Sequence, residues 1–350
     1  MSSSTLRTRP KNAAIVGLGW WGQHILRQMT GSDVVRIVCA VGSREEHRAH
    51  ADKFDVAFTT DFARVLGDAS IEFVILATPH AQHAQHARQI EAVAGAGKHV
   101  FCEKPVGLSV EEVSKSLEAC RVADVRFGVG HERRFEPAVE ELRRLLVDGS
   151  LGTIMHVEAS FNHDKLRGIA GDNWRVSAQG EIPLAMTATG IHLTDLFLDL
   201  VGPIETVTAF PATRMSNTGY ADTLSVHFGF ASKATGYLNT VLATPFYSRL
   251  AMFGSEAWAE VRDSSHPDEA GASTLTVQFR TGSPSVAKLS SRDSVRVNLE
   301  RFALSIEGKA SYPFTEAQIL ENIAVMSAVS RSIAARRSVS ISEVLSRPPI

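Results

Sequence analysis

Three glycines near the start of the chain have the spacing of a phosphate-binding turn. Gly17, Gly19 and Gly22 form the pattern G-x-G-x-x-G between an apolar run, residues 13–16, and an amphipathic stretch. In a strand–turn–helix unit the first glycine permits the tight turn, the second lets the backbone approach a pyrophosphate, and the third allows close helix packing. The N–H groups at the helix N-terminus then face the phosphates. The pattern predicts a dinucleotide site, and the alternative is a glycine-rich turn without a ligand.

The end of the second strand candidate carries the residues expected to select the cofactor. About 20 residues after the glycine turn, an acidic side chain would hold the ribose 2′-hydroxyl of NAD. The chain has Ser43 and Arg44 instead, and a planar guanidinium matches the oxygens of a 2′-phosphate. We therefore predict NADP as the preferred cofactor, with NAD as the alternative if Arg44 is only a solvated residue. Trp20 and Trp21 are expected to shield the pyrophosphate edge or to pack the first helix.

Positioning these residues requires a parallel sheet in the first third of the chain. Short apolar runs alternate there with amphipathic stretches, which predicts strands buried on both faces and joined by helices. Right-handed crossovers then favour a doubly wound Rossmann sheet, an α/β fold. The strand candidates are residues 13–16, 34–41, 56–58, 73–77, 99–102 and 126–129, and the helix candidates are residues 21–30, 45–53, 62–66, 83–94 and 110–123.

The pattern changes after about residue 131. Runs of strands with few helices predict an α+β C-terminal domain with an open, mostly antiparallel sheet. The strand candidates are residues 153–161, 204–210, 223–230, 234–242, 248–254, 257–261, 274–280 and 302–307, and the helix candidates are 136–147, 185–201 and 315–335. We predict a flexible tail at 1–11, a dinucleotide-binding domain at 12–131 and a substrate-binding and oligomerisation domain at 132–350.

Several further motifs follow in a characteristic order. Gly-Lys-His-Val at 97–100 precedes Glu-Lys-Pro at 103–105, and later come Arg-Arg-Phe at 133–135 and Gly-Ile-His-Leu-Thr-Asp at 190–195. With the glycine turn, this order resembles the Gfo/Idh/MocA family, which includes glucose-fructose oxidoreductase and inositol 2-dehydrogenase. The resemblance covers about residues 12–340. It implies a Rossmann domain followed by an open sheet often used for dimer or tetramer contacts, and hydride transfer on sugars, polyols, cyclic diols or related compounds.

The candidate catalytic residues suit the oxidation of a secondary alcohol or the reverse reduction. A cation stabilises the developing alkoxide, and a neutral imidazole accepts the hydroxyl proton. Lys104 follows the fifth strand candidate, where ligands bind in doubly wound sheets, and the resemblance implies a catalytic or nicotinamide-positioning role for it. His192 is the expected proton acceptor or donor, and Asp195, on the same helix face, is expected to orient it or contact substrate. The alternative for Lys104 is a surface lysine without a catalytic role. The alternative for His192 is a histidine at the start of a helix with Asp195 as its local partner.

The resemblance also implies further contacts. Cofactor contacts are expected from Ala77, Thr78, Pro79, His80, His83 and Glu103, and substrate contacts from Arg134, Trp174, Arg175 and His192. The repeat of His80, His83 and His86 is not completed by Cys or Asp, so no metal site is predicted. Inositol dehydrogenase-like members have an Asp four residues before His192, where this chain has Ala188. This departure keeps open a second class of function, a non-catalytic NAD(P)-binding redox sensor or regulatory protein.

Composition narrows the remaining possibilities. The 350 residues carry a formal net charge of −2, with basic residues scattered along the chain, so we expect neither a nucleic-acid nor a membrane partner. Three cysteines without a C-x-x-C pair give little support to disulfides or zinc. No secretory signal or long apolar segment is apparent, which favours a cytoplasmic protein. We expect a small-molecule substrate and a homodimer or homotetramer formed through the C-terminal sheet.

Overall fold

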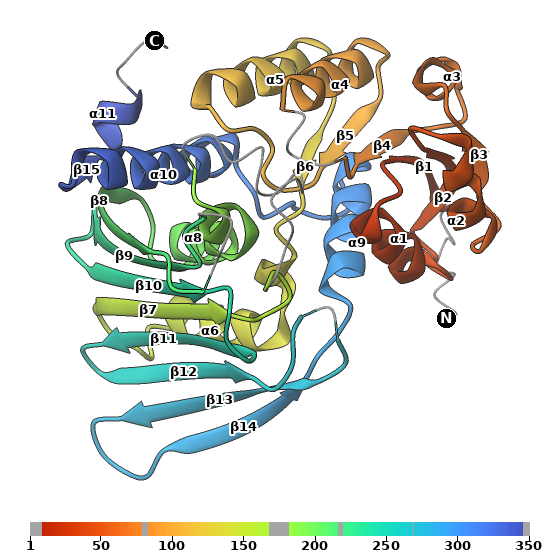
Figure 1. Ribbon diagram of the computed structural model, residues 1–350. Helices are drawn as coiled ribbons and strands as arrows, with labels where there is room; N and C mark the ends of the chain where they lie inside the picture. Colours follow the sequence, from red (N-terminus) through yellow and green to blue (C-terminus); the bar gives the residue numbers. More distant parts are fainter. Residues whose placement is uncertain (1–8, 79–82, 168–181, 216–219, 268, 346–350) are drawn as a thin grey trace, which may run out of the picture. The chain divides into compact units, whose positions relative to one another are not determined.

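Two β-sheets of different kinds organise the chain (Figure 1). The computed structural model describes residues 9–78, 83–167, 182–215, 220–267 and 269–345. The chain divides into a first unit, residues 1–107, 112–132 and 295–315, and a second unit, residues 108–111, 133–294 and 316–350. The fold class predicted from the sequence is confirmed in both units, because one sheet is parallel and the other is mostly antiparallel.

The first unit contains a six-stranded sheet in the order β3-β2-β1-β4-β5-β6. Every strand pair in it is parallel, and the strand order reverses between β1 and β4, as in a doubly wound nucleotide-binding sheet. Its elements are β1 (Lys11–Val16), α1 (Trp20–Met29), β2 (Val35–Val41), η1 (Glu45–His47), α2 (Arg48–Asp52), β3 (Ala57–Thr59), α3 (Phe62–Gly67), β4 (Phe73–Leu76), α4 (His83–Gly95), β5 (His99–Cys102), α5 (Val110–Val122), β6 (Phe127–Val129) and α9 (Ser294–Ile306).

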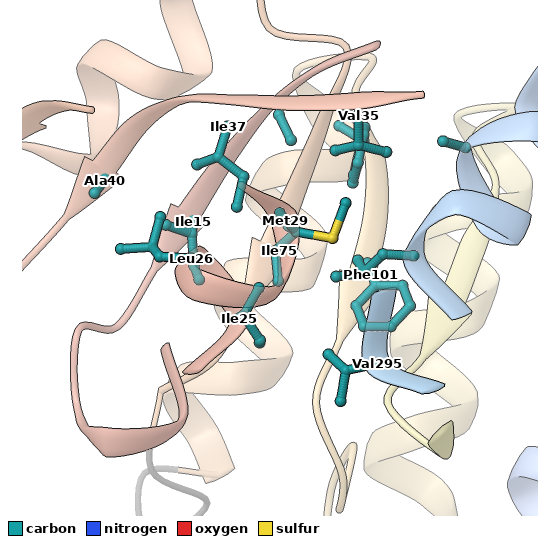
Figure 2. Close-up of a cluster of buried hydrophobic side chains, with 14 of the residues drawn as sticks. Ile15, Ile25, Leu26, Met29, Val35, Ile37, Ala40, Ile75, Phe101 and Val295 are labelled. Atoms are coloured by element: carbon teal, nitrogen blue, oxygen red, sulfur yellow. The ribbon is translucent and has the colours of Figure 1, made fainter. Parts of the chain in front are cut away.

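Apolar side chains cover both faces of this sheet. Ile15, Ile75 and Phe101 project toward α1 and α9 and join a cluster with Met29 and Val295 (Figure 2). The alternate residues of the same strands are also buried, and α4 contacts β4 and β5. Burial on both faces explains why the strands are continuously apolar in the sequence.

Helix α9 corrects one expectation. Residues 302–307 were predicted to form a strand of the second domain, but they lie largely within α9. Val295, Leu299 and Phe302 recur at helical spacing and pack into the core of the first unit. A short apolar run does not distinguish a strand from a buried helix. Residues 295–315 therefore return to the first unit, although the sequence placed them in the second domain.

The second unit contains a nine-stranded mixed sheet in the order β14-β13-β12-β11-β7-β10-β9-β8-β15. The pair β7–β10 is parallel, and the other pairs are antiparallel. Its elements are η3 (Glu132–Phe135), α6 (Pro137–Val147), β7 (Ile154–Asn162), η4 (Met186–Gly190), α8 (Ile191–Leu200), β8 (Ile204–Ala212), β9 (Thr223–Phe230), β10 (Thr235–Val241), β11 (Tyr247–Gly254), β12 (Ala257–Asp263), β13 (Ala272–Phe279), β14 (Ser285–Ser290), α10 (Glu316–Ala335), β15 (Val339–Ser340) and α11 (Ile341–Leu345). Residue 132, which opens η3, belongs to the first unit.

Helices cover one face of the nine-stranded sheet, and the other face is open as far as the described residues show. Helices α6, α8 and α10 contact its strands. Along β7, Val157 and Ala159 are buried, whereas Glu158 and Ser160 between them are half-buried. This alternation is typical of a sheet with one packed face. Among the described residues, no helix is long and apolar enough to cross a bilayer.

Candidate active site

The residues expected to contact the cofactor follow the carboxyl ends of parallel strands. The backbone ladder continues one residue beyond several of these strands and holds their loops side by side. The bonds are Gly17 N–H to Val41 O (2.9 Å), Ala77 N–H to Val16 O (2.8 Å), Glu103 N–H to Leu76 O (2.9 Å) and Gly130 N–H to Cys102 O (2.9 Å). The loops after β1, β4, β5 and β6 therefore share one edge of the sheet, which is where doubly wound folds bind ligands.

The glycine turn has the geometry of a pyrophosphate cradle. Gly17 has a φ of +101°, and a Cβ there would lie 2.6 Å from the Ala77 carbonyl oxygen. A Cβ on Gly22 would lie 1.9 Å from the Gly17 oxygen, so α1 packs against the turn at a distance only glycine permits. Beside Gly19 nothing in the described chain lies within 4 Å of an added Cβ. The open space at Gly19, next to the N-terminus of α1, fits a dinucleotide phosphate.

The two tryptophans of the turn have different surroundings. Trp20 is 60 % exposed, whereas Trp21 is half-buried, and both rings stack on His24 one turn along α1. Trp21 therefore packs the first helix, one of the two roles considered for it. Trp20 lies at the surface beside Gly19, and its contact with the pyrophosphate stays a prediction.

The residues expected to select the cofactor follow β2. Ser43 and Arg44 are exposed, and the Arg44 side chain has a weak exposed contact with Glu46, at 3.5 Å between Nε and Oε2. Exposed pairs of this kind contribute little, so the guanidinium can exchange Glu46 for a phosphate. The structure thus places a hydroxyl and an accessible cation where the 2′ position is expected, and NADP preference stays a prediction.

The loop after β4 is described in part. Ala77 and Thr78 directly follow the strand, and the Thr78 hydroxyl donates to the Gln89 side chain at 3.1 Å. His86 Nε2 lies 3.0 Å from the Thr78 carbonyl oxygen, and burial lowers the pKa of this histidine. Pro79 and His80 lie outside the described residues, and His83 begins α4 with a side chain that is likewise outside them.

The segment after β5 places a buried acid beside a half-buried lysine. Glu103 is 6 % exposed, and Lys104 is half-buried, with a cis peptide bond to Pro105. Burial, and secondly the charge of Glu132, raise the pKa of the Glu103 carboxyl from 4.5 to about 8. Trp21 and Lys104 act in the opposite direction but more weakly. Because Lys104 comes two residues after the carboxyl end of β5, it lies at the same edge of the sheet as the glycine turn.

In the second unit, His192 lies in the first turn of α8 and is 7 % exposed. Two hydrogen bonds to Asn322 of α10 hold this turn in place. The Thr194 hydroxyl donates to Asn322 of α10 at 2.6 Å, and the Asn322 amide donates to the Ile191 carbonyl oxygen at 3.2 Å. The π-helical turn η4 precedes α8, and such turns are frequent at functional sites. Ala188, four residues before His192, is half-buried.

Asp195 and Arg134 form a buried two-pronged ion pair. Arg134 Nε and Nη2 donate to the two carboxylate oxygens of Asp195 at 2.8 and 2.7 Å, and the two side chains are 1 % and 3 % exposed. Arg134 Nη1 also contacts Asp199 at 3.3 Å and Gln318 at 3.1 Å. Through these contacts Arg134 joins η3 to α8 and α10, so the ion pair holds these three elements in position. The substrate contact expected of Arg134 and the catalytic role expected of Asp195 stay predictions that this geometry does not support.

The sequence did not single out the aromatic surroundings of His192. Phe161, at the end of β7, has its ring centroid 6.4 Å from that of His192 and 5.4 Å from that of His266. The ring centroid of His163 lies 5.7 Å from that of Phe161 and 5.5 Å from that of His266. The Arg133 guanidinium lies 4.8 Å from the Phe161 ring centroid. The residues of this aromatic cluster are far apart in the sequence. The one signal that could have pointed to the cluster is the position of Phe161 near the end of a strand.

Glu132 is the other residue that sequence reasoning missed. It lies three residues beyond β6 and is 8 % exposed, and the rule that strand ends carry ligand-binding residues would have found it. The two predicted substrate contacts Trp174 and Arg175 lie outside the described residues. Within the described part of the chain, no three His, Cys, Asp or Glu side chains gather as a metal site would require. The absence of a metal stays a prediction.

Comparisons with known proteins agree with this arrangement. Residues 11–131 match the model of an oxidoreductase family with an NAD-binding Rossmann fold, and residues 139–260 match the Gfo/Idh/MocA C-terminal domain. The chain belongs to the Gfo/Idh/MocA family. The resemblance inferred from the motifs is therefore confirmed, and the protein is an oxidoreductase with an NAD(P)-binding domain.

Individual proteins and solved structures are also similar to this chain. The chain is 28 % identical to the uncharacterized oxidoreductase YrbE of Bacillus subtilis, over 84 % of this chain and 85 % of that protein. It is 26 % identical to the trans-1,2-dihydrobenzene-1,2-diol dehydrogenase of Mus musculus, over 66 % of this chain and 68 % of that protein. Among solved structures, levoglucosan dehydrogenase with NADH and levoglucosan has a TM-score of 0.81 at 19 % identity, over 95 % of this chain and 99 % of that chain.

Proposed function

We propose that this oxidoreductase prefers NADP and transfers a hydride between the nicotinamide and a secondary alcohol or carbonyl of a small cyclic hydroxylated compound. The observation that carries the proposal is the half-buried Lys104 at the carboxyl end of β5, on the same sheet edge as the open cradle at Gly19. The phosphate cradle suits binding of the dinucleotide, and the separate cation suits stabilisation of charge on a substrate beside the nicotinamide.

The chain's own residues supply charge and proton transfer. A nicotinamide cofactor held at the cradle of Gly17, Gly19 and Gly22 would supply the hydride acceptor or donor. Lys104 stabilises negative charge on the substrate oxygen, which develops as the hydroxyl proton leaves. His192, buried in the first turn of α8, accepts that proton in oxidation and returns it in reduction. The ion pair of Asp195 with Arg134 holds α8 in place, so that a change there alters the position of His192.

The substrate class follows from what surrounds His192. Ala188 places a methyl group where inositol dehydrogenase-like relatives have a carboxylate. The site therefore lacks one acceptor for the hydroxyl groups of a polyol at this position. The nearby Phe161 ring adds apolar surface. Two relatives act, by name, on a cyclic dihydrodiol and on an anhydrosugar. We therefore expect a ring compound that carries few hydroxyl groups, in preference to a fully hydroxylated polyol.

A substrate screen tests the enzyme proposal. The purified protein is assayed with NADP+ and NAD+ against cyclic diols, anhydrosugars, aldoses, polyols and hydroxy acids. Turnover of one class is expected, and Lys104→Ala and His192→Ala should each lower kcat by about 10²- to 10⁴-fold, the usual contribution of a positioned acid, base or charge. If the protein binds cofactor but turns over no class, the non-catalytic sensor suggested by Ala188 becomes the better account.

Cofactor preference has its own test. Replacing Arg44 with Ala should weaken NADPH binding by about 10- to 100-fold, since a hydrogen bond to a charged group contributes about 1.5–3 kcal/mol. NADH binding should be unchanged. Arg121→Ala is the matched control, because Arg121 is also an exposed arginine that pairs with a nearby glutamate. Equal losses of NADPH and NADH affinity in Arg44→Ala would contradict the role of Arg44.

The open face of the nine-stranded sheet is the proposed self-association surface. Phe210 is 58 % exposed and contacts the ring of His227, which in turn contacts Tyr237 on the same face. Exposed aromatic groups on an uncovered sheet are typical of interfaces. We expect a dimer or tetramer in light scattering, and Phe210→Glu should shift it toward the monomer. An unchanged mass in that variant would argue against this face.

A further inference from the structure

Two carboxyl groups lie at the ends of neighbouring strands of the Rossmann sheet. Glu103 follows β5, and Glu132 lies three residues beyond β6. Strands β5 and β6 pair in parallel with Cys102 opposite Val129. A Cβ added to Gly130 would lie 2.3–2.6 Å from the Glu103 carboxyl atoms, so this carboxyl rests against the backbone two residues before Glu132. The two acids are therefore brought together by strand register within one unit.

Both carboxyl groups are withdrawn from water. Glu103 is 6 % exposed and Glu132 is 8 % exposed. Charged groups almost never occupy such positions unless they are paired, because the cost of desolvation is large. Two adjacent carboxylates cannot both ionise without repulsion, so a buried pair keeps a proton at a pH at which isolated acids have lost theirs.

Several described groups surround this pair. The Lys104 backbone N–H lies 3.3 Å from Glu103 Oε2, and the Lys104 ammonium is a nearby positive charge. The half-buried Trp21 of α1 has a buried indole nitrogen that makes no well-formed hydrogen bond within the described chain and lies near enough to favour ionised Glu103. Cys102 is buried beside Glu103 and has a raised pKa, so it stays a neutral thiol. His131, the neighbour of Glu132, is 5 % exposed.

We propose that Glu103 and Glu132 hold one proton between them and release it when the oxidised nicotinamide binds. This rests on the proposed function. In a doubly wound sheet the half formed by β4, β5 and β6 binds the second mononucleotide of a dinucleotide, which carries the nicotinamide. The oxidised ring has one positive charge and the reduced ring has none. A doubly ionised pair is therefore stabilised only by the oxidised form, and the displaced proton passes to the solvent.

The pair consequently links the redox state of the bound cofactor to pH. Raising the pH favours the oxidised form at this site, and lowering the pH favours the reduced form. Glu132 acts through Glu103, so it is a positioning residue. The raised pKa of Glu103, near the physiological range, agrees with a proton that is held in the free protein and is lost on binding a cation.

The test measures cofactor binding without turnover. The full chain is titrated with NADP+ and with NADPH by calorimetry between pH 6.5 and 9, in two buffers with different heats of ionisation. Proton release is expected to be larger with NADP+ than with NADPH, because only the oxidised ring carries the positive charge. The ratio of the two dissociation constants should change about tenfold over this range, since one unit of pKa difference between the two complexes corresponds to a factor of ten. The 2′-phosphate is common to both forms, so its own titration cancels in the ratio.

Two variants and one control complete the experiment. Glu132→Gln and Glu103→Gln should each abolish NADP+-linked proton release and flatten the ratio, whereas Glu118→Gln, an exposed glutamate of α5, should behave as wild type. Equal proton release with NADP+ and with NADPH in the wild type overturns the proposal without any variant. Wild-type behaviour in either Glu103→Gln or Glu132→Gln also overturns it. Failure of the wild type to bind any nicotinamide cofactor would instead overturn the proposed function.

Discussion

Replacing Arg134 with Met tests whether this arginine holds the second unit together or serves the substrate. The substitution leaves Asp195 buried, 3 % exposed, and without the two donors at 2.7 and 2.8 Å. Removing one partner of a buried ion pair costs about 3–5 kcal/mol, because the remaining charge is uncompensated. For a domain of this size 1 kcal/mol shifts Tm by about 2–4 °C, so we expect the transition of the second unit to fall by roughly 6–20 °C.

Calorimetry and circular dichroism measure this transition. The matched control is Arg144→Met, because Arg144 is exposed and pairs with Glu141 on the surface of α6, where pairs contribute at most about 1 kcal/mol. The double variant Arg134→Met/Asp195→Leu removes both charges and should regain most of the lost stability. A Tm for Arg134→Met within about 2 °C of the control, together with a raised KM, would refute this reasoning and restore the substrate role.

Three further predictions concern the first unit. Gly22→Ala should lower Tm or the folded yield, because its Cβ would lie 1.9 Å from the Gly17 oxygen, whereas Gly19→Ala should fold normally and lose NADPH affinity, as fluorescence titration would show. The folded-state pKa of Glu103 is raised from 4.5 to about 8, so the folded protein keeps a proton that the unfolded chain releases. Stability therefore falls as pH rises between these values, and the Tm of Glu103→Gln relative to wild type should rise from pH 6 to 8.5. Lys98→Met should destabilise by about 2–3 kcal/mol in chemical denaturation, because the buried ammonium donates to two main-chain carbonyls.

The architecture was largely predictable because its signals are local. Strands buried on both faces are continuously apolar, and the glycine turn stands at a strand–helix junction, so the Rossmann unit and its cofactor turn follow from short stretches of sequence. Some elements were not predictable in this way, and two of them show why. Strand β14 is exposed along almost its whole length and has no apolar alternation, and α9 presents a short apolar run that also suits a strand.

The sequence by itself determined which groups follow the carboxyl ends of the parallel strands: the glycine turn, Ser43 and Arg44, and the neighbours Glu103 and Lys104. It also determined that a histidine lies early in an apolar helix. These follow from residue type and from the periodicity of neighbouring residues, which need no distant contact. Only the tertiary structure decided which charged groups are paired and which are protonated. Arg134 and Asp195 are 61 positions apart and meet through packing, and the pKa of Glu103 depends on burial and on Glu132. Ion-pair energies and proton affinities are set by distance and desolvation, and both arise only when distant segments fold together.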